Sequence, residues 1–77
     1  MKLEIRFKNQ SDISRFVNAI KDVPCNIDLS HGRYQVDAKS IMGIYALDIS
    51  KPLTLTAYTD DKDVKEQLKD RLSEYLA

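Results

Sequence analysis

Residues 36–47, VDAKSIMGIYAL, contain the change of pattern on which the fold of this chain rests. Up to Ala38, apolar and polar residues alternate, which is typical of a strand with one buried face. From Ser40 to Leu47 the alternation stops, and the segment is too short for a long helix and too apolar for a bare loop. We therefore expect a helix of one to two turns here, with Ser40 as its N-cap.

The segment before this run predicts a β-hairpin. Residues 25–30 and 33–38 both alternate, and His31-Gly32 between them is typical of a turn. Cys25 lies on the apolar side of the first of these strands, so we expect it to be a buried, inert thiol. Residues 2–8 and 53–58 alternate in the same way and predict two further strands.

Two other segments have helical periodicity. Residues 13–23 carry an apolar stripe at helical spacing, and either Ser11 or Asp12 is suited to cap its start. Pro24 is expected to end this helix, because proline disfavours helical geometry in the residue before it. Residues 60–76 predict the last helix. Its expected apolar face consists of Val64, Leu68, Leu72, Tyr75 and Leu76.

The predicted order is β-α-β-β-α-β-α, within a single domain at residues 1–77. A chain of this length buries only about 60% of the surface that its unfolded form exposes, so there is room for one sheet and one layer of helices. The apolar faces need one another for burial. We expect an α+β fold, an open-faced β-sandwich with a four-stranded antiparallel sheet and helices on one face.

Composition excludes several functional classes. The 12 basic and 12 acidic residues cancel, which argues against a nucleic-acid binder that relies on positive charge. One cysteine and one histidine allow no internal disulfide and no zinc site, and we expect no cofactor. The charged start is no signal peptide, and no apolar run is long enough to span a membrane. We therefore expect a cytoplasmic protein. No set of side chains suited to catalysis appears, so we expect a protein that is not an enzyme.

The run Lys39-Ser40-Ile41-Met42-Gly43 resembles the serine-site segment of the HPr family, the small phosphocarriers of the bacterial sugar phosphotransferase system. It follows the third predicted strand, as it does in that family, and the predicted order of elements is also the family's order. The resemblance covers nearly the whole chain and implies the HPr fold.

The phosphate-carrying histidine of that family lies in a Gly-Leu-His-Ala-Arg-Pro run at the start of the first helix. Here residues 8–11 resemble the approach to the run, but no histidine follows. Aligned from the left, Ser14 takes the histidine's place, whereas alignment from the right deletes several residues of the motif. The resemblance therefore implies a degenerate active-site position at Ser14 and Arg15. We interpret the only histidine, His31, as a solvated turn residue.

The same resemblance implies roles for the central run. Ser40 is a candidate regulatory phosphorylation site for HPr kinase, after which a transcription regulator would bind. Ile41 and Met42 correspond to a docking patch for phosphotransferase-system proteins, and Lys39 joins them as a candidate partner-binding residue. The residues alone leave two alternatives open: Ser40 as a helix cap only, and Ile41 and Met42 packed on the sheet.

These observations favour a non-catalytic regulatory or interaction protein that works through protein partners. In keeping the serine and lacking the histidine, the chain is similar to the catabolite repression HPr. The alternative is that the fold is reused as a small ligand-binding or oligomerising scaffold with no role in the phosphotransferase system. A third hypothesis is phosphotransfer through an unexpected residue.

Overall fold

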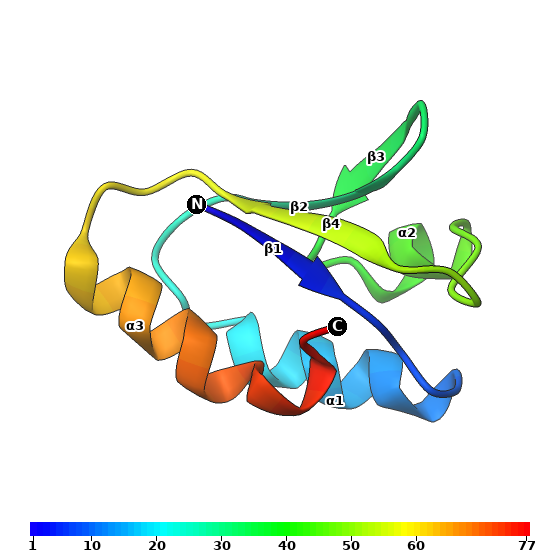
Figure 1. Ribbon diagram of the computed structural model, residues 1–77, viewed down its shortest axis with the longest axis horizontal. Coiled ribbons are helices and arrows are strands. Elements are labelled where there is room, and N and C mark those ends of the chain that lie inside the picture. Colours follow the sequence, from blue (N-terminus) through cyan, green and yellow to red (C-terminus); the bar gives the residue numbers. More distant parts are fainter.

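The computed structural model describes all residues 1–77 and has the predicted α+β architecture. Three helices and a short 3-10 turn accompany four strands, in the predicted order (Figure 1). The elements are β1 (Lys2–Ile5), α1 (Ser11–Ile20), β2 (Ile27–His31), β3 (Tyr34–Asp37), α2 (Ile41–Tyr45), β4 (Leu53–Ala57), α3 (Lys62–Arg71) and η1 (Ser73–Tyr75).

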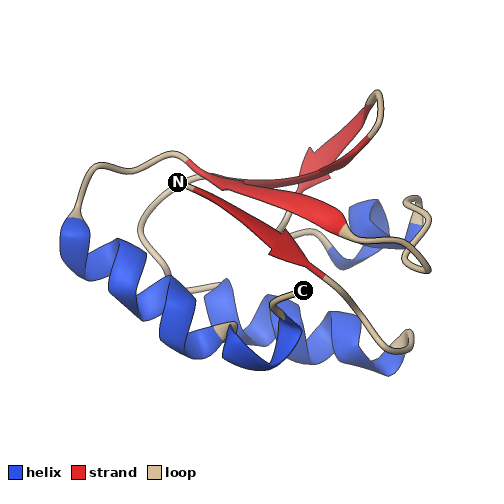
Figure 2. Ribbon diagram, viewed as in Figure 1, coloured by secondary structure: helices blue, strands red, loops and turns tan.

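The four strands form one antiparallel sheet in the order β1-β4-β2-β3. The first strand pairs with the last, so that Lys2 lies opposite Thr56 and Ile5 opposite Leu53. Helices α1 and α3 cover one face of the sheet, and no helix covers the other face (Figure 2). The predicted open-faced β-sandwich is confirmed. None of the three helices has the length and apolar character required to cross a membrane.

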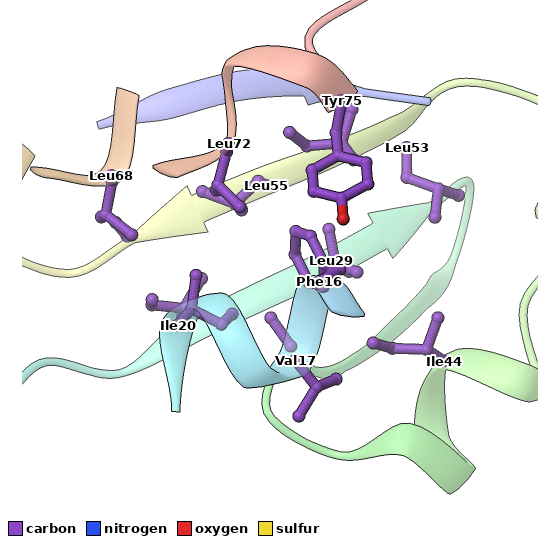
Figure 3. Packing of buried hydrophobic residues seen from close by; sticks show 14 of the residues in the cluster. Phe16, Val17, Ile20, Leu29, Ile44, Leu53, Leu55, Leu68, Leu72 and Tyr75 are labelled. Atoms are coloured by element: carbon purple, nitrogen blue, oxygen red, sulfur yellow. The ribbon is translucent and has the colours of Figure 1, made fainter. Parts of the chain in front are cut away.

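The core lies between the sheet and the helices. It contains 19 buried residues, and Figure 3 shows Phe16 of α1 and Tyr75 of η1 facing Leu29 of β2 within it. Phe16 packs edge-to-face on Tyr75, with ring centroids 5.7 Å apart, and on Phe7, at 5.1 Å. Edge-to-face geometry brings the positive edge of one ring to the negative face of the next. This aromatic cluster therefore joins the β1–α1 loop, α1 and the C-terminal turn.

The start of α1 differs from the prediction. The helix begins at Ser11, so Gln10 occupies the N-cap position, and its side chain makes no capping hydrogen bond. The prediction of Ser11 or Asp12 as the cap was wrong, because both residues lie inside the first turn. The Asp12 carboxylate instead accepts a hydrogen bond from the Lys8 amide at 2.9 Å, and the Ser11 hydroxyl donates to the Asn9 side chain.

Three element ends also differ from the predicted pattern. Helix α1 ends at Ile20, well before Pro24, although Val23 is still buried in the loop that follows. Cys25 lies in this loop and is half-buried, because β2 begins only at Ile27. Leu76 does not share the buried face of the last helix. It follows η1, pairs with Ile5 in an isolated bridge, and is 41% exposed.

The β2–β3 hairpin turns one residue later than predicted. His31 is the last residue of β2 and lies opposite Tyr34, so the turn consists of Gly32 and Arg33. Gly32 has a φ of +59°, a left-handed conformation that glycine adopts without a Cβ clash. A two-residue loop of this kind matches the twist of the flanking strands.

Candidate functional site

Ser40 caps the short helix α2, as predicted. Its backbone is extended, and its side-chain oxygen accepts a hydrogen bond from the Gly43 amide at 3.1 Å. Gly43 is held closely on both sides: a Cβ on it would lie 3.2 Å from Ser40 Oγ and 3.3 Å from Val36 Cβ. The missing side chain therefore lets α2 approach β3 while the cap is formed. Sequence reasoning did not assign this role to Gly43.

An apolar surface surrounds this cap. Met42 is 78% exposed, Tyr45 46% and Ile41 37%, whereas Ile44 of the same helix is fully buried. The helix is thus anchored through one side chain and presents three others outward. We call Ser40, Ile41, Met42 and Tyr45 the α2 surface. Tyr45 was not among the predicted residues, because a five-residue helix gives no periodicity from which to find its outer face.

Lys39 has a different environment from its neighbours in the motif. Its ammonium group donates to the carbonyl oxygens of Val23 at 2.7 Å and Cys25 at 3.0 Å. The half-buried side chain therefore ties the α1–β2 loop to the end of β3. The structure does not bring this charge to the α2 surface.

Removing the Ser40 cap is expected to have a measurable cost. The Ser40→Ala variant should lose about 0.5–2 kcal/mol of unfolding free energy, because the Gly43 amide loses its acceptor. Ser40→Asp should lose little, since aspartate caps well and its charge suits the helix N-terminus. Urea denaturation of both variants measures this difference. Unchanged stability of the alanine variant would contradict a capping role.

The predicted degenerate position lies at the start of α1. Ser14 is exposed, and its hydroxyl donates to the Ser11 carbonyl oxygen at 3.4 Å. The Arg15 guanidinium lies 3.2 Å from an Asp12 carboxylate oxygen and 3.3 Å from one of Glu74. The charge of Glu74 is the largest cause that raises the pKa of Arg15 above its ordinary value, and Asp12 adds to it. Arg15 thus joins α1 to the C-terminal turn.

The hollow beside this ion-pair network is small, with a volume of about 50 Å³. Its lining residues are Arg6, Lys8, Asp12, Arg15, Glu74 and Tyr75. His31 does not line it and lies at the tip of the β2–β3 hairpin. Nowhere do three histidine, cysteine, aspartate or glutamate side chains gather in a metal-binding arrangement.

The comparisons with known proteins agree with this geometry. Residues 11–77 match the family model PTS-HPr, described as the PTS HPr component phosphorylation site. A crystal structure of HPr-C-His from Thermoanaerobacter tengcongensis is 26% identical, with a TM-score of 0.74, over 96% of this chain and 92% of that one.

A second crystal structure, of a phosphocarrier protein HPr from Bacillus anthracis str. Ames, has a TM-score of 0.66 at 23% identity. The alignment covers 97% of this chain and 93% of that one, and it supports the fold. A search of curated proteins finds no match. Because the family model matches all but the first ten residues and the fold is shared, the chain belongs to the HPr family of phosphotransferase-system components.

Proposed function

We propose that this chain is a non-catalytic, regulatory member of the HPr family that acts in the cytoplasm through protein partners. The partners would bind at the α2 surface, with Ser40 as the regulatory phosphorylation site. The observation that carries the proposal is the position of Ser40, a half-exposed helix cap beside the 78% exposed Met42. HPr proteins are phosphocarriers that work with protein partners rather than enzymes in themselves, and this arrangement would use the same kind of contact.

Phosphorylation of Ser40 would change the α2 surface by its charge. A phosphate adds about −1.5 to −2 charges and three strong acceptor oxygens. It would stand beside the apolar side chains of Ile41, Met42 and Tyr45, which are exposed. An apolar partner would then be repelled, whereas a partner that presents arginine would be recruited.

The residues at the start of α1 support the proposal that this chain does not carry phosphate on histidine. No histidine lies before His31 in the sequence. The guanidinium of Arg15, the residue after Ser14, already faces the carboxylates of Asp12 and Glu74. The charge of Arg15 is therefore already balanced within the chain, and Arg15 is not a free guanidinium for a phosphoryl group.

The proposal is tested with HPr kinase and ATP, followed by intact mass measurement and mapping of the modified residue. We expect one phosphate, on Ser40, and none on the Ser40→Ala variant. Ser50→Ala is the matched control, since Ser50 is an exposed serine in a turn outside the α2 surface. Phosphorylated and unmodified protein would then be compared in pull-downs, with Met42→Ser reducing capture of an apolar partner. An unmodified Ser40 with no phosphorylation-dependent partner would favour the scaffold alternative.

A further inference from the structure

The two edge strands of the sheet, β1 and β3, differ in whether another segment of the chain pairs with them. The edge at β1 is covered by the C-terminal segment: Arg6 donates its amide to the Tyr75 carbonyl at 2.7 Å, and Ala77 donates to the Glu4 carbonyl at 3.0 Å. No strand or terminal segment pairs with the edge at β3, where β2 is the only neighbouring strand, although helix α2 packs beside β3. An uncovered edge presents unpaired amide and carbonyl groups, which are a template for another strand.

The pairing with β2 shows which groups of β3 face outward. Ala38 donates its amide to the Ile27 carbonyl at 2.8 Å, so the backbone of Ala38 faces β2. Backbone direction alternates along a strand. The amide and carbonyl groups of Val36 and Tyr34 therefore also face β2, and those of Gln35 and Asp37 point away from the sheet. The Asp37 carbonyl already accepts a hydrogen bond from the Ser40 amide at 3.0 Å, so Gln35 is the residue of β3 that offers both of its outward groups to another strand.

The side chains of β3 are divided between its two faces. Tyr34 and Val36 share the face toward the helices, where Tyr34 is 72% exposed and Val36 is half-buried. Arg33, Gln35 and Asp37 alternate with them and are exposed. Neither Arg33 nor Asp37 takes part in any of the ion pairs of the chain. The edge thus carries an exposed apolar side chain and two opposite charges that have no ion-pair partner, although the Asp37 carboxylate accepts a hydrogen bond from the Lys39 amide at 2.9 Å.

We propose that two copies of this chain pair in antiparallel fashion along β3, with Gln35 opposite Gln35 of the second copy. This register places Arg33 opposite Asp37 of the second copy on one face, and Tyr34 opposite Val36 on the other. The two-fold symmetry repeats both contacts. Opposite charges and aromatic–β-branched pairs directly across an antiparallel ladder are the stabilising cross-strand combinations.

Charge complementarity selects both the register and the occupant. A shift that places Val36 opposite Val36 carries Arg33 past Asp37 to residue 39, beyond the end of β3, and so removes both opposite-charge pairs. A shift that places Tyr34 opposite Tyr34 moves Arg33 to Gln35 and leaves Asp37 without the arginine. The edge is therefore complementary to itself in one register, which points to a second copy rather than to an unrelated peptide. This dimer is independent of the role proposed for the α2 surface.

Sedimentation of the full chain over a range of concentrations tests the dimer. The weight-average mass should rise from 8.9 kDa toward twice that value as the concentration approaches about 1 mM, the weak end of specific affinities. Gln35→Pro removes one outward amide and leaves the backbone hydrogen bonds to β2 in place, although it loses the side-chain hydrogen bond from Gln35 to Asp28. It should therefore abolish dimerisation while the circular dichroism spectrum is kept. A mass that stays at 8.9 kDa throughout would overturn the proposal.

A charge swap tests the register and does not depend on the proline variant. Arg33→Asp and Asp37→Arg should each weaken self-association by about tenfold or more, because two attractive pairs become repulsive. An equimolar mixture of the two single variants should associate again, since each chain then faces the opposite charges. If the mixture associates no better than either variant alone, the register is wrong. If dimers survive Gln35→Pro but are lost in Met42→Ser, the α2 surface is the interface and the proposal fails.

Discussion

Phe16→Ala is expected to remove a large share of the free energy of unfolding at 25 °C. Phe16 is fully buried and contacts both other rings of the aromatic cluster, so its loss leaves a cavity between the β1–α1 loop, α1 and the C-terminal turn. Truncation of a buried phenylalanine costs about 3–5 kcal/mol. A 77-residue domain has a total stability of about 4–12 kcal/mol at the usual value per residue, so the variant would lose at least about a quarter of it.

Urea denaturation followed by circular dichroism measures this loss. Phe16→Leu, which keeps most of the volume, should lose clearly less than the alanine variant. Tyr34→Ala is the matched aromatic control: Tyr34 is 72% exposed, and its removal should change monomer stability by no more than about 0.5 kcal/mol. A cost below about 1 kcal/mol for Phe16→Ala would show that the three rings do not hold the C-terminal turn in place.

Incubation with enzyme I and phosphoenolpyruvate is expected to leave this protein without phosphohistidine. In the alignment from the left, Ser14 of α1 takes the place of the phosphate-carrying histidine. Its hydroxyl is a poor nucleophile, because it has no base beside it and donates to a backbone carbonyl oxygen. The only histidine, His31, lies at the far end of β2 in the hairpin. A phosphocarrier should therefore take up nearly one phosphate per chain in this reaction, and this protein should take up none.

Intact mass measured under conditions that preserve acid-labile phosphate tests this expectation. The HPr of Bacillus anthracis, whose fold this chain shares, serves as the positive control in the same reaction. A stoichiometric phosphate on this chain that disappears in His31→Gln would contradict the expectation and support the third hypothesis. A phosphate that persists in His31→Gln and disappears in Ser14→Ala would assign transfer to the serine.

The sequence predicted the order of elements because each strand has one apolar face and each long helix one apolar stripe. It also predicted the Ser40 cap, since a serine before a short apolar run has a local role that needs no knowledge of the tertiary structure. The contacts that it missed are long-range. Arg15 meets Glu74, 59 residues later, and the Lys39 ammonium meets carbonyl groups of the α1–β2 loop.

The pattern of apolar residues also failed to predict where a helix ends when tertiary contacts decide that point. The apolar stripe of α1 continues to Val23, but the helix stops at Ile20 and the chain buries Val23 from a loop. Leu76 fits the helical spacing of α3, but the helix gives way to η1, and Leu76 pairs with Ile5 instead. Spacing along the sequence cannot distinguish these cases, because both geometries bury residues at similar intervals.

The position of β4 between β1 and β2 has a consequence for the timing of folding. Strand β1 is synthesised before the other three strands, but it has no neighbouring strand until Leu53–Ala57 has been made, because Lys2 pairs with Thr56. Before that point only α1 and the β2–β3 hairpin have local partners. Such non-local pairing slows the search for the native state relative to helical proteins of the same size. The domain is therefore expected to fold as one cooperative unit after β4 has been made, without a stable half that contains β1 to β3 alone.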